Sequence, residues 1–223
     1  MSLVAWNNLY KKGKQDSKWP WSEVVSLVYK YFYQSIKKRK KIKILELGSG
    51  YGANIPFFLD LGFNYFGIES SRVAVNLILK RFPSLRGKMI VGDFTKKISH
   101  KHKFDLILDR GSMTHNSTSS IKKAVKIMKK TLKPNGIYIC TDWFSTNHGD
   151  YLNGKMQEDK YTRKNFVGQF NFYKGIIHFA DKKILNFFFK DWHLLQLQEK
   201  QVNRIIPKNK TKLAFWTIVA RKK

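Results

Sequence analysis

Blocks of apolar residues alternate with amphipathic blocks from about residue 41 onward. The short apolar runs are typical of buried strands, and the amphipathic blocks have the 3.6-residue spacing of helices. This pattern predicts strands at 42–47, 65–68, 89–91, 104–108 and 137–140, and helices at 52–61, 71–81 and 118–132. Strands that alternate with helices predict βαβ units and therefore an α/β fold with a mostly parallel sheet.

The two ends of the chain have different patterns. Apolar residues recur with helical spacing over 23–36, which predicts a helix before the first strand. Residues 143–190 are mixed and aromatic, and strands at 192–197 and 213–220 then flank a basic loop, which indicates a C-terminal antiparallel hairpin. We expect residues 1–40 to form an N-terminal helical extension that packs over the ligand site derived below, and residues 41–223 to form the main domain.

Three glycines follow the first predicted strand, at Gly48, Gly50 and Gly52. In an open parallel sheet, ligands bind at the carboxyl ends of the strands, and the first strand-to-helix turn lies nearest to them. Glycine adopts backbone angles that other residues avoid, and it lets a ligand approach the main chain. The helix that follows points free N–H groups at a bound anion. The glycines therefore predict a ligand site at this turn.

Acidic residues end the next strands in the same order. Glu69 ends the second strand, where a carboxylate can accept hydrogen bonds from both ribose hydroxyls. Asp93 follows the third strand, within reach of an adenine amino group, and Phe94 is placed to lie against the ring. An adenosine-type ligand is the expectation from these positions. The spacing of Gly48, Gly50 and Ala53 also satisfies a dinucleotide fingerprint. A short-chain dehydrogenase would need a Tyr-x-x-x-Lys pair as well, but matches such as Tyr33–Lys37 and Tyr151–Lys155 arise by chance in a chain with 35 lysines.

Five stretches of the chain resemble the sequence motifs of class I S-adenosylmethionine-dependent methyltransferases. They are Leu45–Gly52, Ile68–Ser71, Gly92–Phe94, Phe104–Arg110 and Leu132–Tyr138, the last with Asn135 where the family has a glycine. The resemblance covers about residues 41–142. It implies a Rossmann-like three-layer sandwich around a seven-stranded, mostly parallel sheet with a C-terminal antiparallel hairpin. It also implies S-adenosylmethionine as the cofactor.

The resemblance implies roles for individual residues. Glu46, Gly48, Ser49, Gly50 and Gly52 would border the methionine part of the cofactor. The ribose would be held by Glu69, with Ser70 beside it, and the adenine by Asp93 and Phe94. The position of Asp109, at the end of the fourth strand, would be near the methyl sulfonium and the substrate mouth.

Methyl transfer to a hydroxyl or an acidic carbon needs a base near the carboxyl ends of strands four and five. His115 is the first candidate, with Asp109 beside it, although His115 equally suits a packing role at the start of the next helix. His148 and Asp150 are further candidates in a loop. Asp109 and Asp142 end neighbouring strands, but Trp143 follows Asp142 where a magnesium-binding methyltransferase has an asparagine, so no metal site is expected.

Composition bears on the partner of the chain. The 223 residues carry a formal charge of +28, from 35 lysines and 8 arginines against 15 acidic residues. This charge raises an RNA methyltransferase as an alternative, but the lysines are dispersed, and the Asp-Pro-Pro-aromatic and Pro-Cys motifs of nucleic-acid methyltransferases are absent. We expect a small, polar or anionic acceptor, with a non-catalytic binding module as a third alternative.

Several features predict a cytoplasmic location. Cys140 is the single cysteine, the first residues lack a signal-peptide pattern, and no apolar run is long enough to span a membrane. The N-terminal aromatic residues, among them Trp6, Tyr10, Trp19 and Trp21, are expected either to close over the cofactor or to pack against the first helix.

Overall fold

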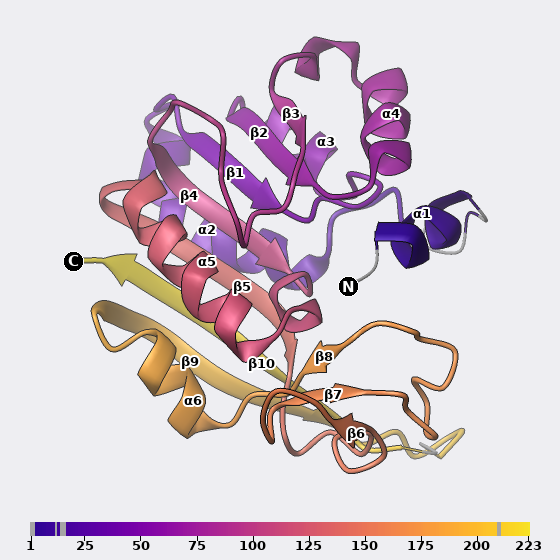
Figure 1. Cartoon of the computed structure of the whole chain (residues 1–223). Coiled ribbons are helices and arrows are strands. Elements are labelled where there is room, and N and C mark those ends of the chain that lie inside the picture. Colours follow the sequence, from indigo (N-terminus) through magenta and orange to yellow (C-terminus); the bar gives the residue numbers. More distant parts are fainter. Residues whose placement is uncertain (1–2, 12, 14–16, 209–210) are drawn as a thin grey trace.

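The computed structural model describes residues 3–11, 13, 17–208 and 211–223, and it is built on one seven-stranded sheet (Figure 1). The strand order is β3-β2-β1-β4-β5-β10-β9. The strands are β1 (Lys43–Leu47), β2 (Asn64–Glu69), β3 (Met89–Val91), β4 (Phe104–Arg110), β5 (Leu132–Phe144), β9 (Trp192–Val202) and β10 (Leu213–Lys222).

Strand direction changes near the C-terminal edge of the sheet. The five strands from β3 to β5 are parallel, whereas β10 pairs antiparallel with both β5 and β9. Because β1 pairs with β2 on one side and with β4 on the other, the chain order reverses at β1. The carboxyl ends of β1 and β4 therefore flank the point where ligands bind in such folds. The predicted Rossmann-like fold with a C-terminal antiparallel hairpin is confirmed.

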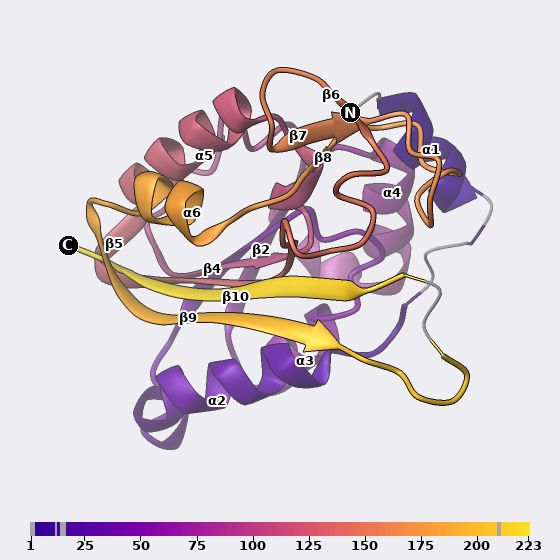
Figure 2. The ribbon, with the colours of Figure 1, turned by 90° about the horizontal axis from the view of Figure 1, so that it is seen from below.

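Helices cover both faces of the sheet, which makes three layers (Figure 2). On one face, buried residues of α2 (Ser22–Lys37), α3 (Ile55–Asp60) and α4 (Arg72–Arg81) share an apolar cluster with Ile44 and Tyr65 of the sheet. On the other face, α5 (Thr118–Thr131) and α6 (Lys182–Phe188) pack on Ile107 and Tyr138. Burial of these apolar side chains is the main stabilising contribution to such a fold.

The predicted helices are present with small differences at their ends. The expected helix at 52–61 begins at Ile55, because residues 51–54 form turns and Pro56 stands in its first turn. Ser71 caps α4 by accepting a hydrogen bond from the Ala74 amide at 3.2 Å. The first expected helix is α2, which buries Val24 and Phe32 against the core. The domain boundary at residue 40 stays a prediction.

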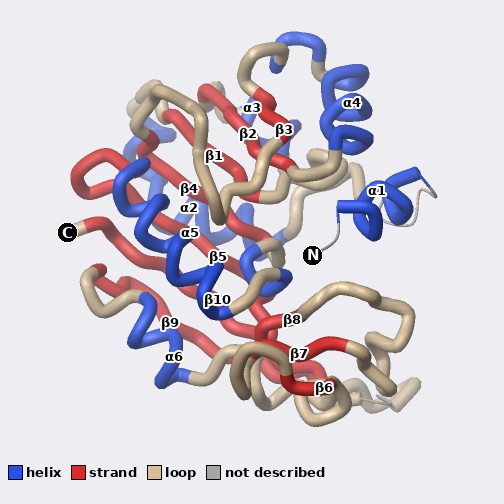
Figure 3. The backbone as a smooth tube through the Cα atoms, viewed as in Figure 1, coloured by secondary structure: helices blue, strands red, loops and turns tan. Residues whose placement is uncertain are grey.

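Several elements were not predicted. Helix α1 (Leu3–Lys11) precedes α2, and residues 145–181 contain a small antiparallel sheet of β6 (Lys155–Met156), β7 (Thr162–Lys164) and β8 (Ile177–His178), visible below the main sheet in Figure 3. Strand β5 also begins five residues before the expected Ile137, with Asn135 in the left-handed region at φ 60°. None of the helices in the described residues has both the length and the apolar character needed to cross a membrane.

Candidate functional site

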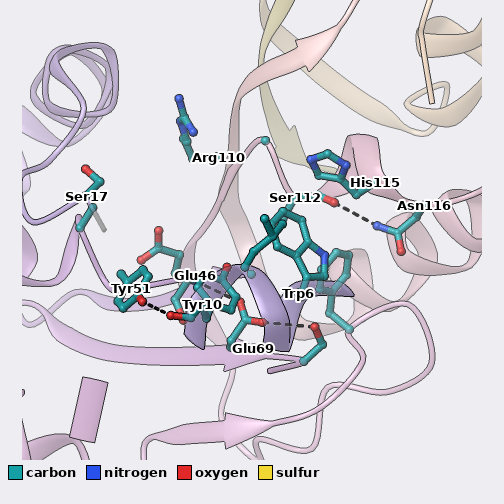
Figure 4. Close-up of a pocket in the computed structure, with 18 of the residues that line it drawn as sticks. Trp6, Tyr10, Ser17, Glu46, Tyr51, Glu69, Arg110, Ser112, His115 and Asn116 are labelled. Atoms are coloured by element: carbon teal, nitrogen blue, oxygen red, sulfur yellow. Dashed lines mark hydrogen bonds between the residues drawn. The ribbon is translucent and has the colours of Figure 1, made fainter. Parts of the chain in front are cut away.

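A cavity of about 580 Å³ lies where β1, β2 and β4 end. Its lining comes from the turn after β1, the ends of β2 and β3, and the segment after β4. The N-terminal region, through α1, Ser17 and Trp21, and residues 144–177 supply the rest. Figure 4 shows residues that line the cavity: Glu46, Tyr10 and Glu69 lie on one side of them, and Trp6 and His115 lie on the other. We call these two sides the acidic end and the aromatic end.

The turn after β1 is narrow and crosses the segment that follows β4. Gly48 has φ +63°, and a Cβ at this position would lie 2.5 Å from the Cβ of Ser112. The Ser112 hydroxyl donates a hydrogen bond to the Leu47 carbonyl at 2.8 Å, which holds the two segments together. Only glycine fits at position 48, because both the backbone angle and the crossing exclude a side chain. The turn thereby exposes its main chain to the cavity.

Glu69 connects the end of β2 to the glycine turn. Its carboxylate accepts hydrogen bonds from the Gly50 amide at 3.0 Å, the Ser71 amide at 2.8 Å and the Ser70 hydroxyl at 3.2 Å. The side chain lines the cavity and is buried, and burial raises the pKa of its carboxyl. A carboxylate has lone pairs for about four hydrogen bonds, so Glu69 retains capacity for a hydroxyl donor.

Glu46, in contrast, directs its carboxylate to partners inside the protein. It accepts hydrogen bonds from the Tyr65 hydroxyl at 2.5 Å and from the Asn54 side-chain amide at 2.8 Å. Burial raises the pKa of Glu46 to about 7, and its two hydrogen bonds oppose this shift. Glu46 lines the cavity at the base of the glycine turn, where it supports Asn54 and β2.

Three other predicted residues complete the acidic end. Asp93 lines the cavity, and its Oδ1 accepts hydrogen bonds from the Thr95 amide at 2.9 Å and the Thr95 hydroxyl at 2.6 Å. Phe94 follows it as a mostly buried ring on the cavity wall. The hydroxyl of Ser49, which also lines the cavity, is buried and finds no hydrogen-bond partner in the part of the chain that the structure describes. A buried hydroxyl without a partner is costly, and a polar ligand would satisfy it.

Two of the residues expected to border the cofactor lie outside the cavity lining, as do the loop candidates His148 and Asp150. Gly52 has φ +77°, and a Cβ there would lie 2.5 Å from the Ile55 side chain. Glycine is therefore needed at position 52 so that Ile55 can pack against the turn. Asp109 is fully buried, and burial raises the pKa of its carboxyl. The Asp109 carboxylate accepts hydrogen bonds from the Ser112 amide at 2.9 Å and from the Tyr138 hydroxyl at 3.0 Å. It holds the segment after β4 in place from behind the cavity wall.

The other carboxylate considered for a metal, Asp142, is paired with cations. It lies 2.9 Å from the Arg110 guanidinium, which in turn lies over the Trp21 ring at 3.6 Å. Among the described residues, no group of three or more His, Cys, Asp or Glu side chains is placed to hold a metal ion.

His115 lies at the aromatic end of the cavity, on the short turn Met113–His115 after β4. Its ring is 5.3 Å from that of Trp6, 5.1 Å from that of Tyr173 and 6.4 Å from that of Phe144. Burial lowers the pKa of His115 to about 3, so the imidazole is neutral near pH 7. Its Nδ1 and the Tyr173 hydroxyl are both buried, and neither has a hydrogen-bond partner among the described residues.

Helix α1 closes the cavity from the N-terminal side. Asn7 accepts a hydrogen bond from the Ser71 hydroxyl at 2.5 Å, and the Tyr10 carbonyl accepts one from the Tyr51 hydroxyl. These bonds place Trp6 at the aromatic end and the Tyr10 hydroxyl 3.1 Å from the position of a Cβ on Gly50. Trp6 and Tyr10 therefore both line the cavity and stack on each other at 5.7 Å, and Trp21 lines the cavity too. Trp19, in contrast, is exposed and lies outside the lining.

Residues 145–181 contribute the aromatic side chains that the sequence did not single out. Phe170, Phe172 and Tyr173 line the cavity from the loop before β8. The fully buried Asp150 carboxylate holds this loop by accepting hydrogen bonds from the Gln169 amide at 3.0 Å and the Phe170 amide at 2.8 Å. His148 stacks on the Phe170 ring at 5.2 Å. The aromatic content of 143–190 was the available signal, but it has no periodicity that indicates which rings converge.

Comparisons with known proteins give a consistent result. Residues 44–136 match the family model described as a methyltransferase domain. A phosphoethanolamine N-methyltransferase from Plasmodium falciparum is 29% identical over 139 residues, which are 60% of this chain. The chain spans only about half of that relative, since the match covers 52% of its length.

Solved structures with the same fold cover most of the chain. A S-adenosylmethionine-dependent methyltransferase from Methanosarcina mazei has a TM-score of 0.66 at 19% identity, over 82% of this chain and 93% of that one. A 1,6-didemethyltoxoflavin-N1-methyltransferase from Burkholderia thailandensis, solved with 1,6-didemethyltoxoflavin and S-adenosylhomocysteine, has a TM-score of 0.67 at 14% identity, over 99% and 87%. At these identities the likeness shows the fold.

Proposed function

We propose that this chain is a class I S-adenosylmethionine-dependent methyltransferase and that it transfers the methyl group of that cofactor to an amine nitrogen of a small molecule. The methyltransferase-domain match over residues 44–136 and the relatives of similar sequence and fold support this proposal. The observation that carries the proposal is the continuity of the cavity, which joins an acidic end suited to a nucleoside with an aromatic end suited to an amine. The cofactor supplies, when bound, an electrophilic methyl group on a sulfonium.

The residues of the acidic end fit the cofactor. Glu69 has free acceptor capacity for the ribose hydroxyls, and Ser49 carries a buried hydroxyl in need of a polar partner. The glycine turn lets the methionine part approach the main chain, since neither Gly48 nor Gly50 presents a side chain. In this proposal Asp93 and Phe94 hold the adenine, and Ser70 supports Glu69. Glu46 and Asp109 act as positioning residues.

The aromatic end fits an amine. The lining carboxylates Glu46, Glu69 and Asp93 all belong to the acidic end, so the rings of Trp6, Phe144 and Tyr173 supply the negative potential of the aromatic end. Aromatic faces attract ammonium groups, by about 0.5–2 kcal/mol for each ring. The neutral amine, rather than the ammonium, carries the lone pair that attacks, and the neutral His115 imidazole accepts a hydrogen bond from its N–H and so orients that lone pair. The rings of this end then stabilise the positive charge that the nitrogen gains on methylation.

The names of two relatives support the choice of nitrogen, since one methylates phosphoethanolamine and the other N1 of didemethyltoxoflavin. A phosphorylated amine is the first acceptor to test. Arg110 lines the same cavity, and in this proposal its guanidinium binds the phosphate in place of Asp142.

The test has a binding part and a turnover part. Calorimetry with S-adenosylhomocysteine measures cofactor binding, and Glu69→Gln is expected to weaken it by about tenfold or more. The matched control is Glu158→Gln, an exposed glutamate outside the cavity lining, which is expected to leave it unchanged. Tight binding of a nicotinamide dinucleotide in place of S-adenosylhomocysteine would refute the methyltransferase proposal.

Methyl transfer from labelled S-adenosylmethionine is then measured with phosphoethanolamine, other small amines, and hydroxyl or carboxyl acceptors. Turnover restricted to amines supports the nitrogen acceptor. Turnover restricted to hydroxyl or carboxyl acceptors would refute that part and leave the cofactor assignment intact.

A further inference from the structure

One face of the molecule carries a concentration of lysine that the cavity does not explain. It is formed by residues 96–103, α5 and the segment 182–191 that contains α6, and we call it the lysine face. These segments hold twelve lysines, no arginine and one acidic residue, Asp191. The lysines are 96, 97, 101, 103, 122, 123, 126, 129, 130, 182, 183 and 190, and all except Lys129 are exposed.

The three segments form one continuous surface. Lys122 of α5 lies 5.3 Å from the ring of Phe187 of α6, and the Lys129 ammonium donates a hydrogen bond to the Asp191 carbonyl at 2.8 Å. A shallow hollow of about 300 Å³ between residues 96–103 and α5 is lined by Lys101 and Lys130 among others. Figures 1 and 2 show α5 and α6 beside each other on the face of the sheet opposite α2.

Acidic partners are scarce on this face. Within the described residues, a salt bridge between Lys96 and Asp93 at 3.7 Å is the one that reaches any of the twelve lysines. Elsewhere on the chain lysines do pair with acids, as Lys133 does with Asp105 at 2.8 Å and Lys200 with Glu23. Lysines that lie close together without acidic partners repel one another, and this repulsion lowers the stability of the folded protein. The same positive potential attracts a polyanion, which would neutralise it.

We propose that the lysine face binds the surface of a membrane that contains anionic phospholipids. Lysine acts as a point charge toward phosphate, whereas arginine is the preferred residue for the forked contacts of nucleic-acid recognition, and this face has no arginine. The Phe187 ring is exposed on this face and lies 5.3 Å from the Lys122 ammonium.

The shape of α5 agrees with this partner. The helix buries Ile121, Ala124, Val125 and Met128 in the core and presents only lysine among charged residues to solvent. Because its apolar face stays in the core, α5 can meet an anionic lipid surface only through the electrostatic attraction of its exposed lysines. The proposal does not depend on the acceptor or on catalysis, because the face lies outside the aromatic end of the cavity.

The test measures partition onto vesicles by co-sedimentation. One vesicle is phosphatidylcholine alone, and the other contains about a third phosphatidylserine. The test variant is Lys97→Gln, Lys101→Gln, Lys123→Gln and Lys126→Gln together. The control variant removes the same charge from the end of α2 and the residues after it, on the other face of the sheet, through Lys37→Gln, Lys38→Gln, Lys40→Gln and Lys41→Gln.

We expect the native chain to bind phosphatidylserine vesicles at about 0.1 M salt and to be released at about 0.5 M. The test variant should lose at least about tenfold in partition, because each lysine near an anionic surface contributes about 1 kcal/mol. The control variant should lose less than about threefold. Equal thermal stability of the three proteins ensures that the lysines act through charge rather than folding.

Three outcomes would overturn the proposal. The first is that the native chain does not bind phosphatidylserine vesicles, and the second is that both variants lose vesicle partition equally. The third is that the native chain binds single-stranded RNA more tightly than vesicles at the same salt concentration, and that only the test variant loses this RNA binding. The last outcome would identify RNA as the partner of the face.

Discussion

The backbone amide of Gly50 donates a hydrogen bond to the Glu69 carboxylate at 3.0 Å, across 19 residues of sequence. This bond links the glycine turn after β1 to Glu69, the last residue of β2. The two features were predicted separately from the sequence, as a close-approach turn and as an acceptor for ribose. The structure shows that they are one unit, because the acid also fixes the turn that it faces.

The glycine turn gives a direct test of backbone approach. Gly48→Ala should lower the free energy of unfolding by about 2–4 kcal/mol, because a side chain is strained at φ +63° and meets Ser112. Gly62→Ala is the matched control, since Gly62 has φ +71° but no atom within 4 Å of an added Cβ, and it should cost only about 1 kcal/mol. Denaturant unfolding measures both. Equal losses would contradict the assigned crossing with Ser112.

Glu46 predicts a pH dependence of stability. Burial raises its pKa from 4.5 to about 7, so the folded protein holds this proton more tightly than the unfolded chain. The resulting stability is fully present below pH 4.5 and is lost as the pH rises to about 7, with a total of about 3 kcal/mol. Glu46→Gln should remove this slope, as denaturant unfolding between pH 5 and pH 8 would show. An unchanged slope would mean that another group produces it.

His115 predicts an unusual pH profile for turnover. Because burial lowers the pKa of His115 to about 3, methyl transfer should show no His115 inflection near pH 6.5. His115→Phe keeps a ring against Trp6 and removes the nitrogens, and it should lower kcat by about 10–100-fold with little change in cofactor affinity. An inflection near pH 6.5 that disappears in His115→Phe would instead make it a titrating base in an open site.

Asp150 is expected to position the acceptor side of the cavity. Asp150→Asn weakens the hydrogen bonds from the Gln169 and Phe170 amides, so it should raise the acceptor KM several-fold, by about 3–10-fold, and leave S-adenosylhomocysteine affinity unchanged. Asp105→Asn is the control, because Asp105 also accepts a backbone amide, from Lys43, but at the opposite end of β4. If both variants change KM equally, the effect is a general loss of stability.

The central sheet and the acidic end were predictable because both depend on local sequence signals. A short apolar run such as 42–47 is typical of a buried strand. Gly48 follows that strand directly, and its positive φ explains why a glycine stands there. The order of the acidic residues followed from the order of the strands. Glu69 and Asp93 accordingly line the cavity, whereas Asp109 turned inward because Tyr138 and Ser112 supply donors that no local pattern reveals.

The aromatic end was less predictable, because its residues converge from distant segments. Trp6 meets His115 across more than 100 residues, and Tyr173 reaches the same ring from the loop before β8. These contacts depend on tertiary placement of α1 and of residues 145–181. His115 was a candidate since it follows β4, but its neutral state depends on rings that the sequence did not assign.

The segment between β5 and α6, residues 145–181, has its two ends next to each other in the structure. The Thr146 amide donates a hydrogen bond to the Ala180 carbonyl at 2.9 Å, and the Ala180 amide donates one to the Phe144 carbonyl at 2.8 Å. A segment whose two attachment points adjoin can be exchanged for another of different length without moving the strands on either side. Residues 147–178 bring Phe170, Phe172 and Tyr173 to the cavity. Exchanging this segment for that of a relative is therefore expected to change part of the aromatic end while the residues of the acidic end stay the same.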